Sequence, residues 1–134
     1  MGQHTVSTSI PFCYGHRIRG HAGKCGHLHG HNARAVIECE GPLDKLGMVV
    51  DFTLIKERIG RWIDDQWDHQ MLLDASDPLA ETLLQLGEPV FPLAGPPTAE
   101  VMAKHLFGIA QNEGLPVVAV HLWESDTSVA TYRE

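Results

Sequence analysis

Residues 25–31 have the sequence Cys25-Gly26-His27-Leu28-His29-Gly30-His31. Because successive side chains of an extended strand alternate between its two faces, His29 and His31 point the same way and can bind one metal ion. Gly30 lies between them and carries no side chain, which lets another backbone segment come close. The spacing therefore predicts a metal site built on a strand.

A third histidine stands upstream, at the end of the segment Phe12-Cys13-Tyr14-Gly15-His16. Residues 5–12 are rich in serine, threonine and β-branched residues, which predicts a strand leading into His16, and residues 33–40 have the alternation of a second strand. Antiparallel pairing would place His16 beside His29 and His31, whereas His27 lies nearer the loop and is a weaker ligand candidate. Three histidines that leave a fourth coordination place open are typical of catalytic zinc.

Cys25 precedes these histidines in a glycine-rich loop and follows Lys24. A neighbouring ammonium group and a nearby metal cation both favour the reactive thiolate. A cysteine can also be a buried, unreactive side chain, which suits Cys13 and Cys39 on the predicted strands better. Cys25 is therefore the candidate base or nucleophile.

Length and composition indicate one globular domain, residues 1–134. Hydrophobic residues make up 43% of the chain and charged residues 20%, as in soluble globular proteins. No apolar run reaches the ~18 residues of a membrane span, and residues 1–10 lack the basic and apolar regions of a signal peptide. We expect a cytoplasmic protein without a membrane partner, whose three cysteines form no even disulfide framework.

Charge is distributed unevenly along the chain. The net charge is −7, yet no Asp or Glu precedes Glu38. The first 37 residues carry Arg17, Arg19, Lys24 and Arg34, a local charge of +4 that leaves −11 for the rest. The acidic remainder argues against a nucleic-acid partner, whereas the basic segment beside a metal cation favours a small polyphosphate ligand.

Two helices are predicted in the second half of the chain. Asp51 or Thr53 caps the first, which ends near Asp68 and has its apolar residues at helical spacing. Those apolar residues are Ile55, Ile59, Trp62, Ile63 and Trp67. Residues 70–86 show no sustained helical or strand period, and the second helix begins after its cap, Thr98.

Residues 117–123 and 128–132 predict a closing pair of strands that forms a hairpin. The element order is then β-β-α-α-β-β, which indicates an α+β fold with an antiparallel sheet of four strands. Such a sheet has two open edges, and edges of this kind are commonly covered by another subunit. We therefore expect a homo-oligomer.

Asp68 and His69 are adjacent, and a carboxylate beside an imidazole can fix its tautomer for proton transfer. The same histidine could simply compensate the dipole at a helix end. Glu124 ends an apolar strand and could accept two hydrogen bonds from a guanidine-like edge of a heterocycle, although a carboxylate there is more often solvated. Thr98 and Glu100 are explained by helix capping.

With these residues in place, the chain resembles the family of 6-pyruvoyl-tetrahydropterin and 6-carboxy-tetrahydropterin synthases. The matching motifs run nearly end to end: residues 12–16, Cys25-x3-His29-Gly30-His31, residues 48–52, Asp68-His69, Pro97-Thr98-Ala99-Glu100 and Glu124-Ser125-Asp126-Thr127. The short spacing from Cys25 to His29 is similar to the 6-carboxy branch, since the pyruvoyl branch typically has a longer gap.

The resemblance implies a tunnelling fold, in which subunits join their sheets into a barrel, often as a hexamer, with active sites between subunits. It implies a lyase that converts 7,8-dihydroneopterin triphosphate to 6-carboxy-tetrahydropterin, acetaldehyde and triphosphate, feeding queuosine-type deazapurine synthesis. The early basic residues would receive the triphosphate.

The resemblance also implies roles for individual residues. Zn²⁺ would be bound by His16, His29 and His31. Cys25 would be the proton-abstracting thiolate, and His69 with Asp68 the second acid/base group. The pterin would be anchored by Glu124 and contacted by the segment that contains Thr98, Ala99 and Glu100.

The chain departs from the family pattern at three places. Leu73 stands where an asparagine is common, Ala99 replaces a hydroxyl residue, and Cys13-Tyr14-Gly15 replaces a run of small residues. Two alternatives remain open. One is a 6-pyruvoyl synthase, which eliminates triphosphate without cutting a carbon–carbon bond; the other, from a different class, is a non-catalytic, histidine-rich metal-binding protein.

Overall fold

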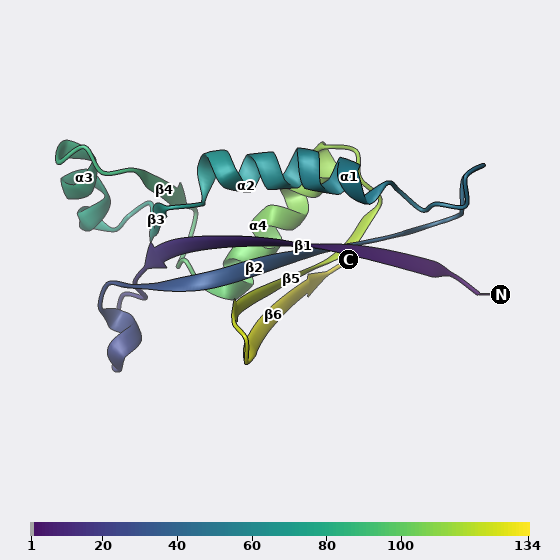
Figure 1. Ribbon diagram of the computed structural model, residues 1–134. Helices are drawn as coiled ribbons and strands as arrows, with labels where there is room; N and C mark the ends of the chain where they lie inside the picture. Colours follow the sequence, from purple (N-terminus) through teal and green to yellow (C-terminus); the bar gives the residue numbers. More distant parts are fainter. Residues whose placement is uncertain (1) are drawn as a thin grey trace.

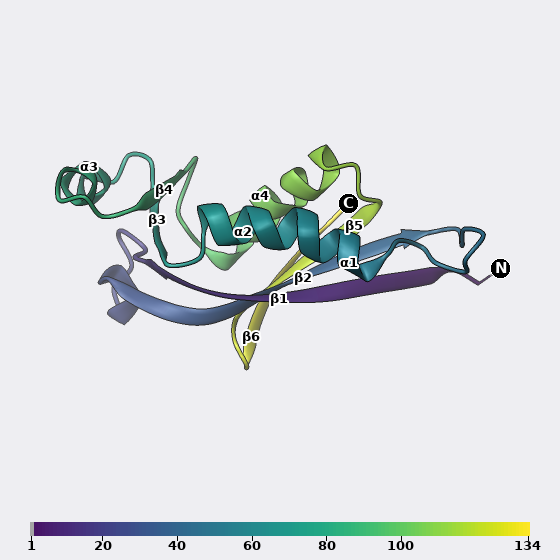
Figure 2. The ribbon, with the colours of Figure 1, turned by 45° about the horizontal axis from the view of Figure 1, so that its top comes forward.

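The computed structural model describes residues 2–134, so Met1, the first residue of the segment without signal-peptide features, lies outside the described residues. Six strands form one sheet in the order β4-β3-β1-β2-β5-β6. Their bounds are β1 His4–His16, β2 His29–Gly41, β3 Gln70–Asp74, β4 Val90–Leu93, β5 Val117–Ser125 and β6 Ser128–Arg133. The long strands curl, and the helices lie over one face of the sheet (Figures 1 and 2). The predicted α+β class is confirmed, but the predicted order β-β-α-α-β-β is wrong: the sheet has six strands rather than four, and two of its pairings are parallel.

Strands β1 and β2 pair antiparallel, with His16 opposite His29 and Tyr14 opposite His31. Every second residue of β1 from Thr8 to His16 is buried, whereas the residues between them are exposed or half-buried. The buried side chains face the helices. The predicted pairing is therefore confirmed, and it brings the three histidines to the loop end of one hairpin.

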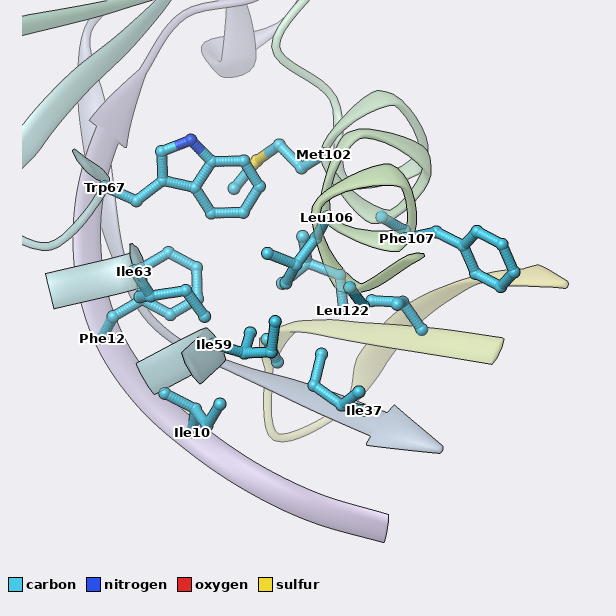
Figure 3. Close-up of a cluster of buried hydrophobic side chains, with 14 of the residues drawn as sticks. Ile10, Phe12, Ile37, Ile59, Ile63, Trp67, Met102, Leu106, Phe107 and Leu122 are labelled. Atoms are coloured by element: carbon cyan, nitrogen blue, oxygen red, sulfur yellow. The ribbon is translucent and has the colours of Figure 1, made fainter. Parts of the chain in front are cut away.

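The first predicted helix is confirmed as a continuous helical run, α1 Phe52–Ile55, η2 Lys56–Gly60 and α2 Arg61–Gln66. Asp51 is its cap and accepts a hydrogen bond from Thr53 N at 2.8 Å. The second is α4 Ala99–Asn112, capped by Thr98. Both pack apolar residues on the strands that carry the histidines, and Figure 3 shows the members of this core, among them Ile10, Phe12, Ile37, Ile59, Ile63, Trp67, Met102, Leu106 and Leu122.

The prediction was wrong for residues 70–86, which have regular structure. Together with the segment up to 93 they form β3, helix α3 Pro78–Gln85 and β4, and β3 runs parallel to both β1 and β4. The neighbours Leu72 and Leu73 are both fully buried, so β3 shows no alternation in the sequence. Asp77 and Pro78 begin helix α3 and do not interrupt regular structure. Asp77 accepts a hydrogen bond from Leu79 N at 2.9 Å, and proline suits the first helical position.

The predicted closing hairpin is confirmed, since β5 and β6 pair antiparallel. β6 forms one edge of the sheet. On the other side of the sheet, β3 covers β1 only at Tyr14 and Gly15 among the described residues. Most of β1 therefore has an unpaired edge. No helix in residues 2–134 has the length and apolar character needed to cross a membrane.

Candidate active site

His16, His29 and His31 converge at the loop end of the β1–β2 hairpin. The Nε2 atoms of His16 and His31 are 3.2 Å apart, and one ring nitrogen of each of the three lies within 4.8 Å of the other two. Their ring centroids are separated by 4.6, 5.1 and 4.9 Å. We call this group the histidine triad; its nitrogens lie close enough together to hold one metal ion.

Backbone carbonyls orient two rings of the triad. His16 Nδ1 lies 2.7 Å from Pro97 O, and His29 Nδ1 lies 2.7 Å from His27 O. Since a carbonyl oxygen can only accept, both Nδ1 atoms carry the hydrogen and donate it. The Nε2 atoms keep their lone pairs, which is the arrangement that metal-binding histidines require.

Burial favours the neutral, metal-binding form of two rings of the triad, those of His16 and His31. Burial lowers the pKa of His16 and outweighs the opposing hydrogen bond to Pro97. Burial also lowers the pKa of His31, against the opposing effect of Glu124. Within the described residues the group has three ligand atoms, and Cys25 is not among them. The donor set therefore fits zinc with one coordination place left for a substrate.

Gly30 permits the close approach of the two strands between the histidines. A Cβ atom at this position would lie 3.1 Å from Tyr14 O, a backbone atom held in the sheet. A side chain here would push β2 away from β1 and displace the rings on either side. The interpretation of Gly30 from the sequence agrees with this geometry.

Glu124 lies beside the triad, with Oε1 3.6 Å from His31 Nε2. An adjoining pocket of about 370 Å³ is lined by Glu124, Ala99, Glu100 and residues 128–131 of the closing hairpin. Thr98 Oγ1 instead accepts a hydrogen bond from Val101 N at 3.2 Å, as a helix cap does. Three of the four candidate pterin-binding residues thus share one pocket, and the hydroxyl of Thr98 caps α4.

Tyr14 is a site residue that the sequence motifs did not single out. Its ring centroid lies 5.0 Å from that of His16 and 5.7 Å from that of His31. Burial, together with the negative charge of Glu124, raises the pKa of its hydroxyl, which therefore stays protonated. The signal was present in the alternation of β1, because Tyr14 shares a face with Phe12 and His16.

Cys25 is exposed and lies in η1 Lys24–Gly26, the turn before β2. Its carbonyl accepts a hydrogen bond from Ile18 N at 2.8 Å, which folds the loop back toward the end of β1. Cys39, in contrast, is fully buried, and this burial raises the pKa of its thiol to about 11. Cys25 and Cys39 therefore differ in burial as their loop and strand positions predicted, whereas Cys13, also expected to be buried, is only partly buried.

Asp68 and His69 form a hydrogen-bonded pair, with His69 Nδ1 2.9 Å from Asp68 Oδ2. Cys13 N donates to Asp68 Oδ1 at 2.9 Å, and His69 N donates to Cys13 O at 2.8 Å. Burial alone would raise the pKa of Asp68, but the hydrogen bonds from Cys13 and His69 lower it. His69 has a φ of 60°, a left-handed conformation that is costly outside glycine and is concentrated at functional sites.

The Asp68–His69 pair and the triad lie on opposite faces of the sheet within one chain. Tyr14 and His16 face the helices, so the side chain of Cys13 points to the other face. Cys13 Sγ lies within 4.8 Å of a ligand atom of Asp68 and of His69, which places the pair on that face. The side chain of His69 is 79% exposed and lines a pocket of about 760 Å³. His29 and His31 also line this pocket, but within the described residues the ligand atoms of the pair and of the triad form two separate groups in one chain.

Three of the four early basic residues are engaged within the chain. Arg17 Nε and NH2 donate to Asp77 Oδ2 and Oδ1 at 2.8 and 2.6 Å. Asp77 is buried, so this pair ties the start of the Cys25 loop to the cap of α3. The guanidinium of Arg34 lies over Trp123, 4.5 Å from the ring centroid. Arg19 NH1 donates to Ser76 O at 3.1 Å. The structure thus gives Arg17, Arg19 and Arg34 intramolecular partners, in addition to any role in binding phosphate.

Asp77→Asn is expected to lower the free energy of unfolding by about 2 kcal/mol, because asparagine can still cap α3 but loses the charged pair with Arg17. Arg17 lowers the pKa of Asp77. The stabilisation is therefore complete above the ordinary aspartate value of about 3.9 and is lost as the pH falls through the lowered folded value. Urea unfolding over a pH series should show the two proteins converging in acid; a gap that persists unchanged would contradict the assignment.

Comparison with known proteins places these features in a family. Residues 5–134 match the family model described as 6-pyruvoyl tetrahydropterin synthase. The chain is 40% identical over 116 residues to the 6-carboxy-5,6,7,8-tetrahydropterin synthase of Rickettsia felis, which covers 83% of this chain and 80% of that protein. The protein of the same name from Haemophilus influenzae is 33% identical over 138 residues, 96% of this chain and 98% of that one.

Solved structures show the same architecture. An uncharacterized protein from Wolinella succinogenes aligns with a TM-score of 0.87 at 24% identity, over 100% of this chain and 99% of that one. The 6-pyruvoyl tetrahydropterin synthase of Caenorhabditis elegans aligns with a TM-score of 0.74 at 21% identity, over 100% and 97% of the two chains.

The synthases among these neighbours have the tunnelling fold, so the sheet, its helices and the triad define a tunnelling-fold protein with a candidate metal centre. The chain belongs to the 6-pyruvoyl tetrahydropterin synthase family, a family of pterin synthase enzymes. The resemblance seen in the sequence motifs is thereby confirmed.

Proposed function

We propose that the chain is a zinc-dependent 6-carboxy-5,6,7,8-tetrahydropterin synthase, a lyase that converts 7,8-dihydroneopterin triphosphate to 6-carboxy-tetrahydropterin, acetaldehyde and triphosphate. The observation that carries the proposal is the name shared by relatives 33% to 43% identical to most of the chain. The solved 6-pyruvoyl synthases are 17% to 21% identical, and this level of similarity supports the fold alone.

In this proposal His16, His29 and His31 hold the zinc through Nε2, with two rings oriented by the carbonyls of Pro97 and His27. When bound, zinc supplies Lewis-acid polarisation of the side-chain oxygens of the substrate. The triad therefore binds the reacting part of the substrate, and the proton transfers fall to other side chains.

Cys25 and His69 are the proposed proton carriers. Cys25, as the thiolate, takes a proton from a substrate carbon. Asp68 accepts the Nδ1 hydrogen of His69, so Nε2 is the ring nitrogen that takes up or gives a second proton. Asp68 thus holds the tautomer that the transfer requires.

Glu124 is the proposed anchor for the pterin ring. A carboxylate can accept two parallel hydrogen bonds from the guanidine-like edge of a pterin. Its pocket with Ala99 and Glu100 adjoins the triad, so a ring bound there can extend its side chain toward the metal. Thr98 caps α4, the helix that contributes Ala99 and Glu100 to this pocket.

The proposed active site is shared between subunits. Because Asp68 and His69 lie on the face opposite the triad, one site needs the triad of one chain and the pair of a second. The edge strand β6 and the unpaired length of β1 allow neighbouring sheets to join. We propose a homo-oligomer, a hexamer with sheets joined into a barrel, that works in the cytoplasm and supplies queuosine-type deazapurine synthesis.

Product analysis with 7,8-dihydroneopterin triphosphate and the zinc-loaded protein tests this function. One acetaldehyde and one triphosphate per substrate are the expected products beside 6-carboxy-tetrahydropterin. Triphosphate without acetaldehyde would instead identify a 6-pyruvoyl synthase, and several bound metals without turnover would identify a metal-binding protein. As a matched control, Cys25→Ala should lose a factor of about 10²–10⁴ in rate while it keeps its zinc.

A further inference from the structure

The pocket beside His69 contains a thiol that the proposed reaction does not use. Cys13 Sγ, a carboxylate oxygen of Asp68 and a ring nitrogen of His69 lie within 4.8 Å of one another. Thiolate, carboxylate and imidazole are the ligand types that zinc takes in proteins. We infer that these three side chains form a second divalent-cation site, distinct from the triad of the same chain, and that a cation bound there inhibits the enzyme.

The backbone holds this cluster together without a metal. The N–H of Cys13 binds Asp68 at 2.9 Å, and the carbonyl of Cys13 accepts from His69 N at 2.8 Å, so all three residues share one anchor on β1. The adjoining pocket of about 760 Å³ is lined by Cys13 and His69, by Gly15 and Gly30, which pair in the β1–β2 register, and by His29 and His31 of the triad. A cation can therefore reach the cluster from solvent without unfolding the sheet.

Binding at this site exchanges a proton for the cation. The thiol of Cys13 releases its proton to solvent when the sulfur becomes a ligand. The Nδ1 hydrogen of His69 moves to Nε2, and the cation takes its place between Nδ1 and the carboxylate of Asp68. One thiolate and one carboxylate then balance the two positive charges of the ion.

The inhibitory effect rests on the function proposed above, whereas the binding itself does not. A cation on Nδ1 leaves His69 Nε2 protonated and unable to accept a proton. Zinc at the triad would support the reaction, and zinc at Cys13 would slow it. The activity of the synthase should therefore rise with the first equivalent of zinc and fall with the second.

Cobalt(II) titration of metal-free Cys25→Ala protein tests the site without an activity assay. The first equivalent goes to the triad, whose ligands are all nitrogens, and should give no sulfur-to-cobalt charge-transfer band. The second equivalent is expected to produce that band, because Cys13 is a ligand and the remaining thiol, Cys39, is buried in the core. Cys13→Ser and His69→Ala, each combined with Cys25→Ala, should no longer bind the second equivalent of cobalt. Both should still bind the first equivalent, and this binding shows that the variants fold correctly.

Binding that stops at one equivalent in Cys25→Ala, or a band that survives Cys13→Ser, would overturn the site. In a separate activity measurement, the second equivalent of zinc should slow the wild-type enzyme about a hundredfold, the loss expected for an acid/base group, and should not slow Cys13→Ser. A second cobalt ion without zinc inhibition would overturn the inhibitory role. Absence of turnover in the wild type would overturn the proposed function, while the titration would still decide the site.

Discussion

His31→Ala is expected to abolish tight metal binding at the hairpin and, with it, turnover of the pterin triphosphate. Loss of an outer hydrogen-bond partner alone typically weakens a metal site about 10- to 100-fold, so the loss of one of three ligands should cost more. His31 is half-buried and its backbone pairs remain in place, so the fold should survive. Metal content after dialysis, together with the circular dichroism spectrum, measures both expectations.

His27→Ala is the matched control for this prediction. His27 is exposed, and only its carbonyl contributes to the triad, through the hydrogen bond to His29 Nδ1. Alanine keeps that carbonyl, so the variant should retain one zinc per chain and full activity. Retention of wild-type zinc affinity by His31→Ala would show that the three rings are not one metal centre.

Co-expression of His31→Ala with His69→Ala is expected to restore activity that neither variant has alone. The first lacks the metal centre but keeps the Asp68–His69 pair, and the second has the reverse defect. If the site takes its halves from two chains, random assembly leaves about a quarter of the sites complete. Purification through two different tags, followed by the pterin assay, measures the recovery.

The pairing of His31→Ala with His29→Ala provides the negative control, because both chains then lack the metal centre. This mixture should stay inactive while it assembles normally. If His31→Ala with His69→Ala is equally inactive although both chains fold and assemble, the triad and the pair must act within one chain. That result would contradict the shared site, which we inferred because the side chains of Cys13 and Tyr14 lie on opposite faces of the sheet.

Local sequence signals predicted the parts of the fold that depend on near neighbours. Alternation along β1 and β2 set the face of the three histidines, and Asp51 and Thr98 marked the starts of the two helical runs. The segment from β3 to β4 could not be predicted from such local signals. Leu72 and Leu73 are buried together, and a proline lies within the edge strand β4, so neither strand shows its period.

The sequence by itself determined the histidine triad, because two strands joined by one loop bring residues of known spacing to a common face. It also placed Asp68 next to His69, but it could not tell on which side of the sheet this pair lies. The tertiary structure decided that point, since the contact of Asp68 with Cys13 joins residues 55 positions apart through the parallel pairing of β3 with β1. Long-range pairing of this kind depends on how the whole core packs, and no local period in the chain records it.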